Sequence, residues 1–158
     1  MNIRLNLQIA VKVMQWIPWR ELRQSSGGPY IEIIWQKPGE REPWTKLQPI
    51  NQEAAQQRSS LIALEDIDPH KHSLSYVPDF AGNIAAAWTV VEKLGLTMTL
   101  CLVGGRPAGD WECELYTKGN PRSLAMEVAN GKANTAPLAI CLAALSACGV
   151  IVPEEAKG

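Results

Sequence analysis

The sequence lacks any uninterrupted apolar run near the ~18 residues that a membrane-spanning helix requires. Its first six residues also lack the basic start, apolar core and cleavage site of a signal peptide. We therefore expect a chain that stays in the cytosol and has no membrane partner.

An excess of charge of one sign is also missing. The 15 Lys and Arg residues nearly balance the 16 Asp and Glu residues, the formal net charge is −1, and no Lys/Arg run occurs. The sequence therefore gives no strong signal for electrostatic binding of nucleic acid. With 158 residues, 46% of them apolar and 20% charged, the chain fits one ordinary globular domain, residues 1–158.

Cysteine is scarce, and no two cysteines form a Cys-x-x-Cys pair. The four are Cys101, Cys113, Cys141 and Cys148. Each lies in an apolar or alternating segment, so we interpret them as small buried hydrophobic residues and expect neither a disulfide nor a metal site. No Gly-x-Ser-x-Gly motif is present, and we expect no catalytic residues and no cofactor.

Only two histidines are available as general bases, and both lie in one short segment. Asp66, Asp68, His70 and His72 alternate along it. In an extended strand this spacing would put four metal-ligand types on one side. Pro69 and Lys71 interrupt the pattern, so we favour a solvated loop, with a metal-dependent hydrolase at His70 and His72 as a weaker alternative.

The N-terminal half shows one apolar helical pattern and one strand pattern. Apolar residues recur at helical spacing over residues 5–17, which predicts a helix that ends before Pro18. Ser, Gly and Pro at 25–29 predict a loop. Residues 30–36 are rich in strand formers, and a turn after them predicts a hairpin with a weaker strand at 44–47. Residues 49–79 predict a loop with partial order.

The C-terminal half is more regular. Asn83 is a suitable N-cap and Gly95 a suitable C-terminal stop for a helix with an apolar stripe between them. Alternating patterns then predict three antiparallel strands, at 96–103, 111–116 and 123–128, with a break at 130–132. The fold class is therefore α+β, a small antiparallel sheet of about four or five strands with helices packed on it.

A last helix is predicted at 138–147, with Asn134 or Thr135 as its cap and Pro137 in its first turn. It is almost wholly apolar, so it needs cover on more than one side. Other parts of the chain or a homodimer or higher homo-oligomer interface would supply this cover, and the sequence leaves both open.

Four stretches resemble the phage ABA sandwich family. They are residues 11–16 (VKVMQW), 84–94 (IAAAWTVVEKL), 111–113 (WEC) and 133–145 (ANTAPLAICLAAL). The resemblance implies helices flanking a small antiparallel sheet, in proteins typically encoded by phages and prophages. It would place the protein in the cytosol of a bacterial host, and it implies little about activity.

The sequence departs from the family pattern in two places. The family tends to have a tyrosine, small hydroxyl residues and an acid just before the central helix, where this chain has Phe80-Ala81-Gly82-Asn83. A site that needs those polar groups is therefore not expected here. Residues 25–79 are longer than the resemblance requires and are interpreted as a variable insertion.

Candidate ligand-binding residues come from a glycine-rich turn and from the aromatic residues. Arg106 lies in Gly104-Gly105-Arg106-Pro107, which we interpret as a hairpin turn because a strand follows it, with an anion contact in an oligomer left open. Tyr30, Trp35 and Trp44 would offer an aromatic surface for a base or a partner. Glu112 and Glu114, with Tyr116 beside them, are interpreted as a solvated strand face rather than an acid–base pair.

Three functional hypotheses follow. The first is a non-enzymatic phage or prophage binding protein that sequesters a small nucleotide-type immune signal of the host. The second is a protein–protein interaction or assembly factor that uses residues 25–79. The third is the hydrolase at His70 and His72.

Overall fold

The computed structural model describes residues 2–42, 53–54, 59–103, 110–118 and 126–152. The chain divides into two units, each of which is described separately below. Unit 1 comprises Met1–Val13 and Pro78–Gly158, and unit 2 comprises Met14–Val77. The α+β class is confirmed, and the described strands form a three-stranded and a four-stranded sheet rather than one sheet.

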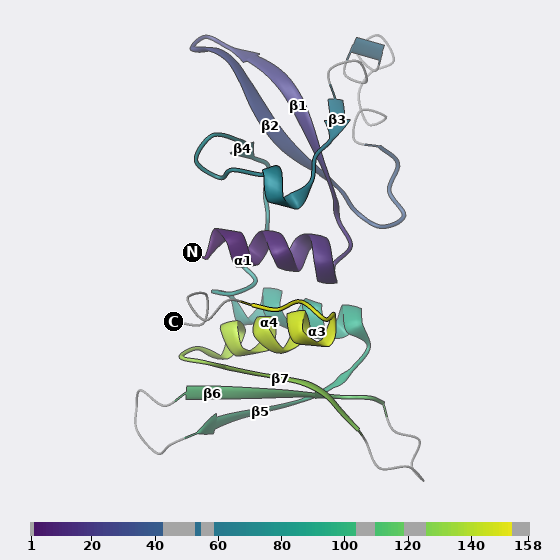
Figure 1. The fold of residues 1–158 in the computed structure, drawn as a ribbon, viewed down its shortest axis with the longest axis vertical. Helices are drawn as coiled ribbons and strands as arrows, with labels where there is room; N and C mark the ends of the chain where they lie inside the picture. Colours follow the sequence, from purple (N-terminus) through teal and green to yellow (C-terminus); the bar gives the residue numbers. More distant parts are fainter. Residues whose placement is uncertain (1, 43–52, 55–58, 104–109, 119–125, 153–158) are drawn as a thin grey trace. The chain divides into compact units, whose positions relative to one another are not determined.

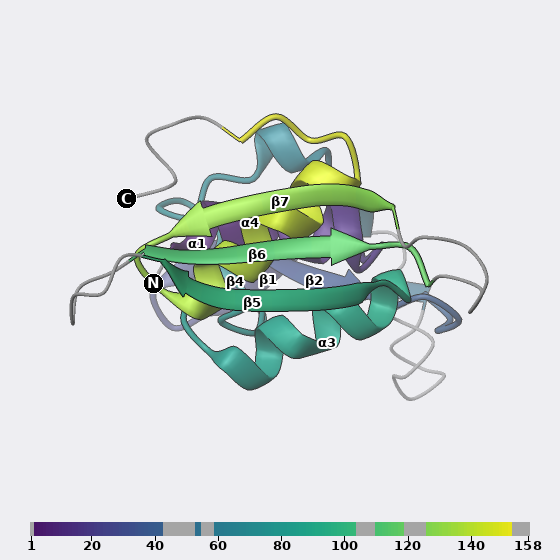
Figure 2. The ribbon, with the colours of Figure 1, turned by 90° about the horizontal axis from the view of Figure 1, so that it is seen from below.

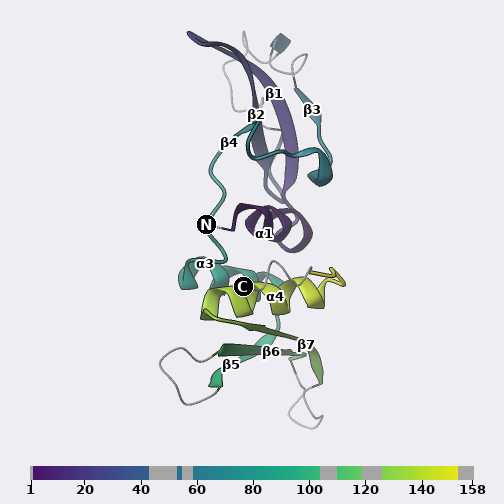
Figure 3. The same cartoon turned by 60° about the vertical axis from the view of Figure 1, so that its left-hand side comes forward.

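Unit 1 is built in layers of one sheet and its helices. Its antiparallel sheet has the order β5-β6-β7, with bounds β5 (Thr97–Val103), β6 (Asp110–Tyr116) and β7 (Glu127–Ala133). The helices are α1 (Ile3–Gln8), the π-helical η1 (Ile9–Val13), α3 (Ile84–Leu94) and α4 (Ala136–Ala147). Figures 1 and 3 show α3 and α4 side by side between the sheet and α1.

Helix α3 begins and ends where the sequence predicts. The Asn83 side chain accepts hydrogen bonds from the backbone amides of Ala85 and Ala86 at 2.9 and 3.1 Å. Gly95 ends the helix in the left-handed region, with φ 65°. The apolar stripe is wider than the buried face, because Ile84 and Trp88 are 49% and 50% exposed.

Helix α4 is buried all round by its own unit. Every residue from Leu138 to Leu145 is buried. The helix packs against β6, β7, α3 and η1, so an apolar surface on several sides is covered within one chain. Figure 2 shows α4 behind β6 and β7 when the sheet is viewed face on. The cover that the sequence requires for this helix is therefore internal.

Strand β7 differs from its prediction. The sequence predicts a strand at 123–128 and a break at 130–132, but β7 runs from Glu127 to Ala133 and includes Gly131. A Cβ at Gly131 would lie 2.5 Å from the amide nitrogen of Ala143 on α4. The glycine therefore marks a close approach of helix to strand, which a glycine inside a strand often does, and not a turn.

Unit 2 contains a long hairpin made of the strand predicted at 30–36, which is part of β2, and an earlier strand that the sequence did not predict. Strand β1 (Ile17–Ser25) pairs antiparallel with β2 (Gly28–Gln36), and the two short strands at its sides are β3 (Ser59–Leu61) and β4 (Ser73–Leu74). The predicted helix over 5–17 ends at Val13, because Ile17 already pairs with Gln36. The loop predicted at 25–29 is the hairpin turn. The predicted strand at 44–47 lies outside the described residues.

Unit 2 has a small core of its own. Trp16, Ile33 and Ile67 are buried, and the rings of Trp16 and Trp35 lie 6.3 Å apart between centroids. The ammonium group of Lys37 lies 5.1 Å from the centroid of the Trp16 ring, which is cation–π range. Unit 2 contains most of residues 25–79 but begins earlier, since β1 is its first strand. That residues 25–79 are an insertion relative to the family stays a prediction.

Among the described residues, no helix is both long enough and apolar enough to cross a membrane.

Candidate binding groove

A half-open groove of about 810 Å³ runs along one edge of the unit 1 sheet. Strand β7 and the residue after it, Asn134, form one wall. Leu142 and Ser146 on α4 form the floor, and residues 149–152 form the other wall. The volume lies in the range of pockets that bind small molecules.

Among the strands that the structure describes, β7 is an edge strand of the unit 1 sheet. In the sheet order β5-β6-β7, β7 pairs with β6 on one side, and no other described strand pairs with its second side. Alternate backbone amides and carbonyls of an edge strand point away from the sheet. The groove therefore presents backbone donors and acceptors as well as side chains.

The second wall is positioned by the end of α4. Gly149 adopts φ 73°, and the backbone amide of Val150 donates to the carbonyl of Leu145 at 3.0 Å. This bond reverses the chain at the helix end and brings the following residues back beside the helix. Ile151 is 93% exposed, so the rim of the groove carries an uncovered apolar side chain.

Charges in the groove are few. Lys132 is the only cation among the described lining residues, and its ammonium group lies 3.0 Å from the Glu112 carboxylate. The Asn130 side chain donates to Glu127 at 2.9 Å. Asp110 adds a carboxylate at one end. The described lining therefore combines polar and apolar residues, with one cation that is already paired and a floor that carries no charge.

Three residues that the sequence predicts to be solvated lie on the outward face of the sheet, beside the groove. They are Glu112, Glu114 and Tyr116. The Tyr116 hydroxyl donates to the Glu114 carboxylate at 2.5 Å. This hydrogen bond and the negative charge beside it raise the pKa of Tyr116 to about 12. A phenol with such a pKa keeps its proton at neutral pH, so this pair acts as a fixed polar contact.

The buried cysteines of unit 1 are not placed for nucleophilic chemistry. Burial raises the pKa of both Cys113 and Cys141 from 9.0 to about 12. The thiolate is the reactive form, and at neutral pH almost none is present at such sites. The prediction that all four cysteines are buried is wrong for Cys101 and Cys148, which are exposed, and partial desolvation raises the pKa of Cys148.

The histidine segment in unit 2 forms a closed turn, not the extended arrangement that would align metal ligands. The backbone amide of His70 donates to Asp68 at 2.9 Å, and the amide of Asp68 donates to His72 Nδ1 at 3.2 Å. The His70 amide and the Lys71 ammonium lower the pKa of Asp68. No cluster of three metal-ligating side chains occurs among the residues that the structure describes. The closed turn does not align these side chains as the extended spacing would, and the choice between a solvated loop and a hydrolase stays a prediction.

Of the four predicted ligand-binding residues, Arg106 and Trp44 lie outside the described residues. Tyr30 and Trp35 are both on β2, five residues apart, so they point to opposite faces of the sheet. The Trp35 ring nitrogen donates to the Ser75 carbonyl at 3.3 Å, whereas Tyr30 lies opposite Arg23 in the hairpin register. The structure does not bring these two side chains together.

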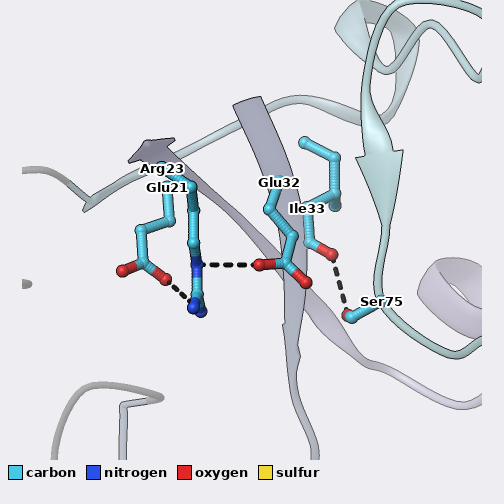
Figure 4. Close-up of polar contacts among 5 residues, drawn as sticks. All are labelled: Glu21, Arg23, Glu32, Ile33 and Ser75. Atoms are coloured by element: carbon cyan, nitrogen blue, oxygen red, sulfur yellow. Dashed lines mark hydrogen bonds and ion pairs between the residues drawn. The ribbon is translucent and has the colours of Figure 1, made fainter. Parts of the chain in front are cut away.

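Tyr30 lies beside a charged cluster that the sequence reading did not identify. Arg23 bridges two carboxylates, with its nitrogens 2.9 Å from Glu21 and 2.7 Å from Glu32 (Figure 4). The Arg23 guanidinium is therefore already neutralised by Glu21 and Glu32, and it is not an open anion site.

Figure 4 also shows a separate contact, in which the Ser75 hydroxyl donates to the carbonyl of Ile33 at 2.7 Å.

Comparison with known proteins identifies the family. Residues 7–145 match the model of the Phage ABA sandwich domain. The chain belongs to this family. The resemblance in the sequence is thereby confirmed.

Among solved structures, the chain is similar to a phage protein from Bacillus cereus ATCC 14579, whose crystal structure was determined at 2.0 Å. The TM-score is 0.48 and the sequence identity 16%, over 97% of this chain and 92% of that chain. No curated protein matches the chain.

In this Phage ABA sandwich protein, the segment before α3 is a structural junction. The buried Asn6 donates to Asp79 at 2.9 Å and accepts from the backbone amide of Ala81 at 3.0 Å. Asp79 in turn accepts from the Gly82 amide at 3.1 Å. The side chain of Phe80 is also buried. These groups satisfy one another, so the segment holds α1 against the start of α3.

Proposed function

We propose that this Phage ABA sandwich protein is a non-enzymatic binding module that captures its ligand in the groove along β7. The observation that carries the proposal is the groove itself, in which a free strand edge, an apolar floor at Leu142 and an uncovered apolar rim at Ile151 meet. Such a combination supplies backbone hydrogen bonds and apolar contact together, as binding sites generally do.

The chemistry of the described residues supports binding rather than turnover. The described lining contains no cysteine and no histidine. Two carboxylates beside the groove serve local contacts, since Glu112 pairs with Lys132 and Glu127 accepts from Asn130, and Asp110 is the carboxylate of the described lining itself. A nucleophile held by a general base, the usual signature of covalent catalysis, does not appear in the described lining.

The hypotheses from the sequence name two classes of ligand, a host nucleotide signal and a protein. Polyphosphate recognition usually employs several cations or a helix N-terminus. The described lining offers one cation, Lys132, which is already paired, and it adds the carboxylate of Asp110. The charge pattern favours a ligand with few negative charges, and a nucleotide signal is the alternative that the experiment below separates by mass.

Native mass spectrometry of protein incubated with bacterial host cytosol tests the proposal. We expect a retained mass on the wild type and its loss in Ser146→Trp, because an indole at this position on the floor fills the groove. The matched control is Lys93→Trp, which places the same side chain on the exposed last turn of α3. Equal retention by both variants, or no retained mass on the wild type, would contradict binding in this groove.

A second candidate, the protein-interaction role of unit 2, is favoured by its exposed apolar side chains. Leu61 is 62% exposed and pairs with Trp19, which pairs with Ile34, so the three form one row across β3, β1 and β2. Tyr30, 37% exposed, lies on the same face. A Leu61→Ser and Tyr30→Ser double variant should then lose its host partner in a pulldown, while Ser146→Trp keeps it. The reverse result would assign the partner to the groove.

A further inference from the structure

We infer that the groove binds an extended polypeptide segment of a partner protein, which pairs with β7 as a fourth strand of the unit 1 sheet. The inference deepens the proposed function, because it rests on the groove being the binding site. It names the class of ligand and the backbone groups that recognise it.

The length of the strand edge in the groove sets the length of the segment. Residues 130–133 of β7 line the groove, and four residues of extended chain span about 13 Å. Their outward backbone groups repeat at the spacing of a strand, and a second extended chain is the ligand that matches such a row of donors and acceptors. About four residues of a bound segment would therefore pair along this wall, and the residues at its two ends would extend beyond the strand.

The floor determines which side chains the segment carries on its inner side. On β7 the inward residues are all small, namely Ala129, Gly131 and Ala133, and α4 lies directly against Gly131. Next to β7, the floor consists of Leu142 and Ser146, with Val150 on the far wall. Since side chains alternate along a strand, every second residue of the segment would face this floor. Apolar side chains of modest size fit those positions.

The outer side of the segment meets Lys132. The side chain of Lys132 is 62% exposed although it contacts Glu112, and Glu112 lies on β6, on the side away from the groove. A carboxylate on the segment would therefore approach the ammonium from the open side, as in an ordinary cross-strand ion pair. The expected segment alternates apolar residues with polar ones, and one of its polar residues is acidic.

The shape of the groove argues against a second copy of this chain as the occupant. Two copies related by a two-fold axis would present the same surface to each other. That surface is concave along β7, with residues 149–152 standing opposite the strand, so two grooves would face each other across a gap. A single extended segment, which has no folded domain directly beside it, fits into such a groove.

Strand β7 also shows devices that limit pairing to a short stretch. Edge strands are commonly protected by lysines and by β-bulges. The register between β6 and β7 shifts at Leu115 and Tyr116, opposite the start of β7, and β7 ends at Ala133. The regular part between them is short, which favours one brief segment over open-ended aggregation of edges.

Selection from a library of displayed random heptapeptides, followed by affinity measurement on synthetic peptides, tests the inference. We expect selected peptides to alternate apolar and polar residues and to include an acidic one. N-methylation of the amides that face β7 should weaken binding by about tenfold or more, while methylation of the opposite amides should not, because only the first set bonds to the strand. Hydrogen exchange at the β7 amides should slow when peptide is bound.

A charge reversal provides the matched variant. Lys132→Glu should turn the preference from acidic to basic peptides, and Lys118→Glu, on an exposed residue beyond β6, should leave it unchanged. Equal loss of affinity from methylation of either set of amides would overturn strand pairing. Failure to select any binding peptide from the library would overturn the peptide ligand. A wild-type protein that forms a dimer, with the dimer dissociating in Ser146→Trp, would overturn it as well. If the wild type then still retains a small molecule that Ser146→Trp loses, the proposed binding function stands without the peptide inference. If it retains nothing, both fail.

Discussion

The side-chain amide of Asn6 on α1 donates to the carboxylate of Asp79 at 2.9 Å, across 73 positions of the chain. Asn6 is buried, and its carbonyl oxygen accepts from the backbone amide of Ala81 at 3.0 Å. One side chain thus satisfies the Ala81 backbone donor and adds a hydrogen bond to a carboxylate that also accepts from the Gly82 amide. It connects the N-terminal helix to the segment that begins α3.

Replacing Asn6 should therefore be costly. We expect Asn6→Ala to lower the free energy of unfolding by about 2–3 kcal/mol, because a buried donor and a carboxylate lose a partner and a cavity is left. Urea denaturation followed by circular dichroism measures the change. Arg4→Ala, on an exposed position of the same helix, is the control and should stay within about 0.5 kcal/mol. Similar losses in both variants would mean that the Asn6 contacts contribute little.

The contact between β7 and α4 gives a second prediction. A methyl group at Gly131 would overlap the carbonyl oxygen of Ala139 and lie 2.5 Å from the amide nitrogen of Ala143. Both atoms belong to the helix backbone and cannot rotate away. Gly131→Ala should lower the free energy of unfolding by about 1–3 kcal/mol. Gly27→Ala in the unit 2 hairpin, where the nearest atom would be 3.8 Å away, is the control. An unchanged stability in Gly131→Ala would show that α4 and β7 are farther apart.

The four cysteines should differ in reactivity. Under native conditions at neutral pH we expect a thiol reagent to modify Cys101 and Cys148, which are exposed, and to spare Cys113 and Cys141. Peptide mass mapping after modification distinguishes them. Because burial raises the pKa of Cys113 and Cys141 from 9.0 to about 12, their neutral forms stabilise the fold below pH 9, and this contribution is lost as the pH rises towards 12. Early modification of Cys141 would show that α4 is not buried as described.

Tyr116 offers a spectroscopic test of the sheet surface. Its folded-state pKa of about 12 lies above its ordinary 10.0, so its bond to Glu114 stabilises the fold below pH 10 and is lost as the pH rises through about 12. Ultraviolet titration in a Tyr30→Phe and Tyr76→Phe background reports Tyr116 alone. Glu114→Gln should lower its pKa towards 10, since the neighbouring negative charge is removed. A Tyr116 pKa that Glu114→Gln does not move would place the cause elsewhere.

Local signals in the sequence predicted the parts of the fold that local chemistry specifies. Asn83 and Gly95 sit at the two ends of α3 as a cap and a left-handed stop, and both roles depend on residues within one turn. The apolar run of α4 also predicted burial on several sides, because the composition of the helix itself requires that cover. Strands β5 and β6 also lie within a residue of their predicted bounds.

Features that depend on distant partners were not predictable in the same way. Strand β1 carries charged residues and contains Pro18, so nothing local distinguishes it from a loop, and its pairing with β2 is what makes it a strand. Gly131 reads locally as a break, although it lies inside β7 because α4 passes close to it. The walls of the groove come from separate segments of the chain. A glycine between alternating residues is the one signal that could have indicated the groove wall.

The fate of the bound ligand tests the central claim, capture without chemical conversion, most directly. The protein is loaded from host cytosol, washed and denatured, and the released compound is compared by mass with the same compound in the untreated cytosol. We predict an unaltered compound in no more than stoichiometric amount, bound by the wild type and by Lys93→Trp but not by Ser146→Trp. A converted product that accumulates beyond the amount of protein would contradict the claim and assign the groove to an enzyme.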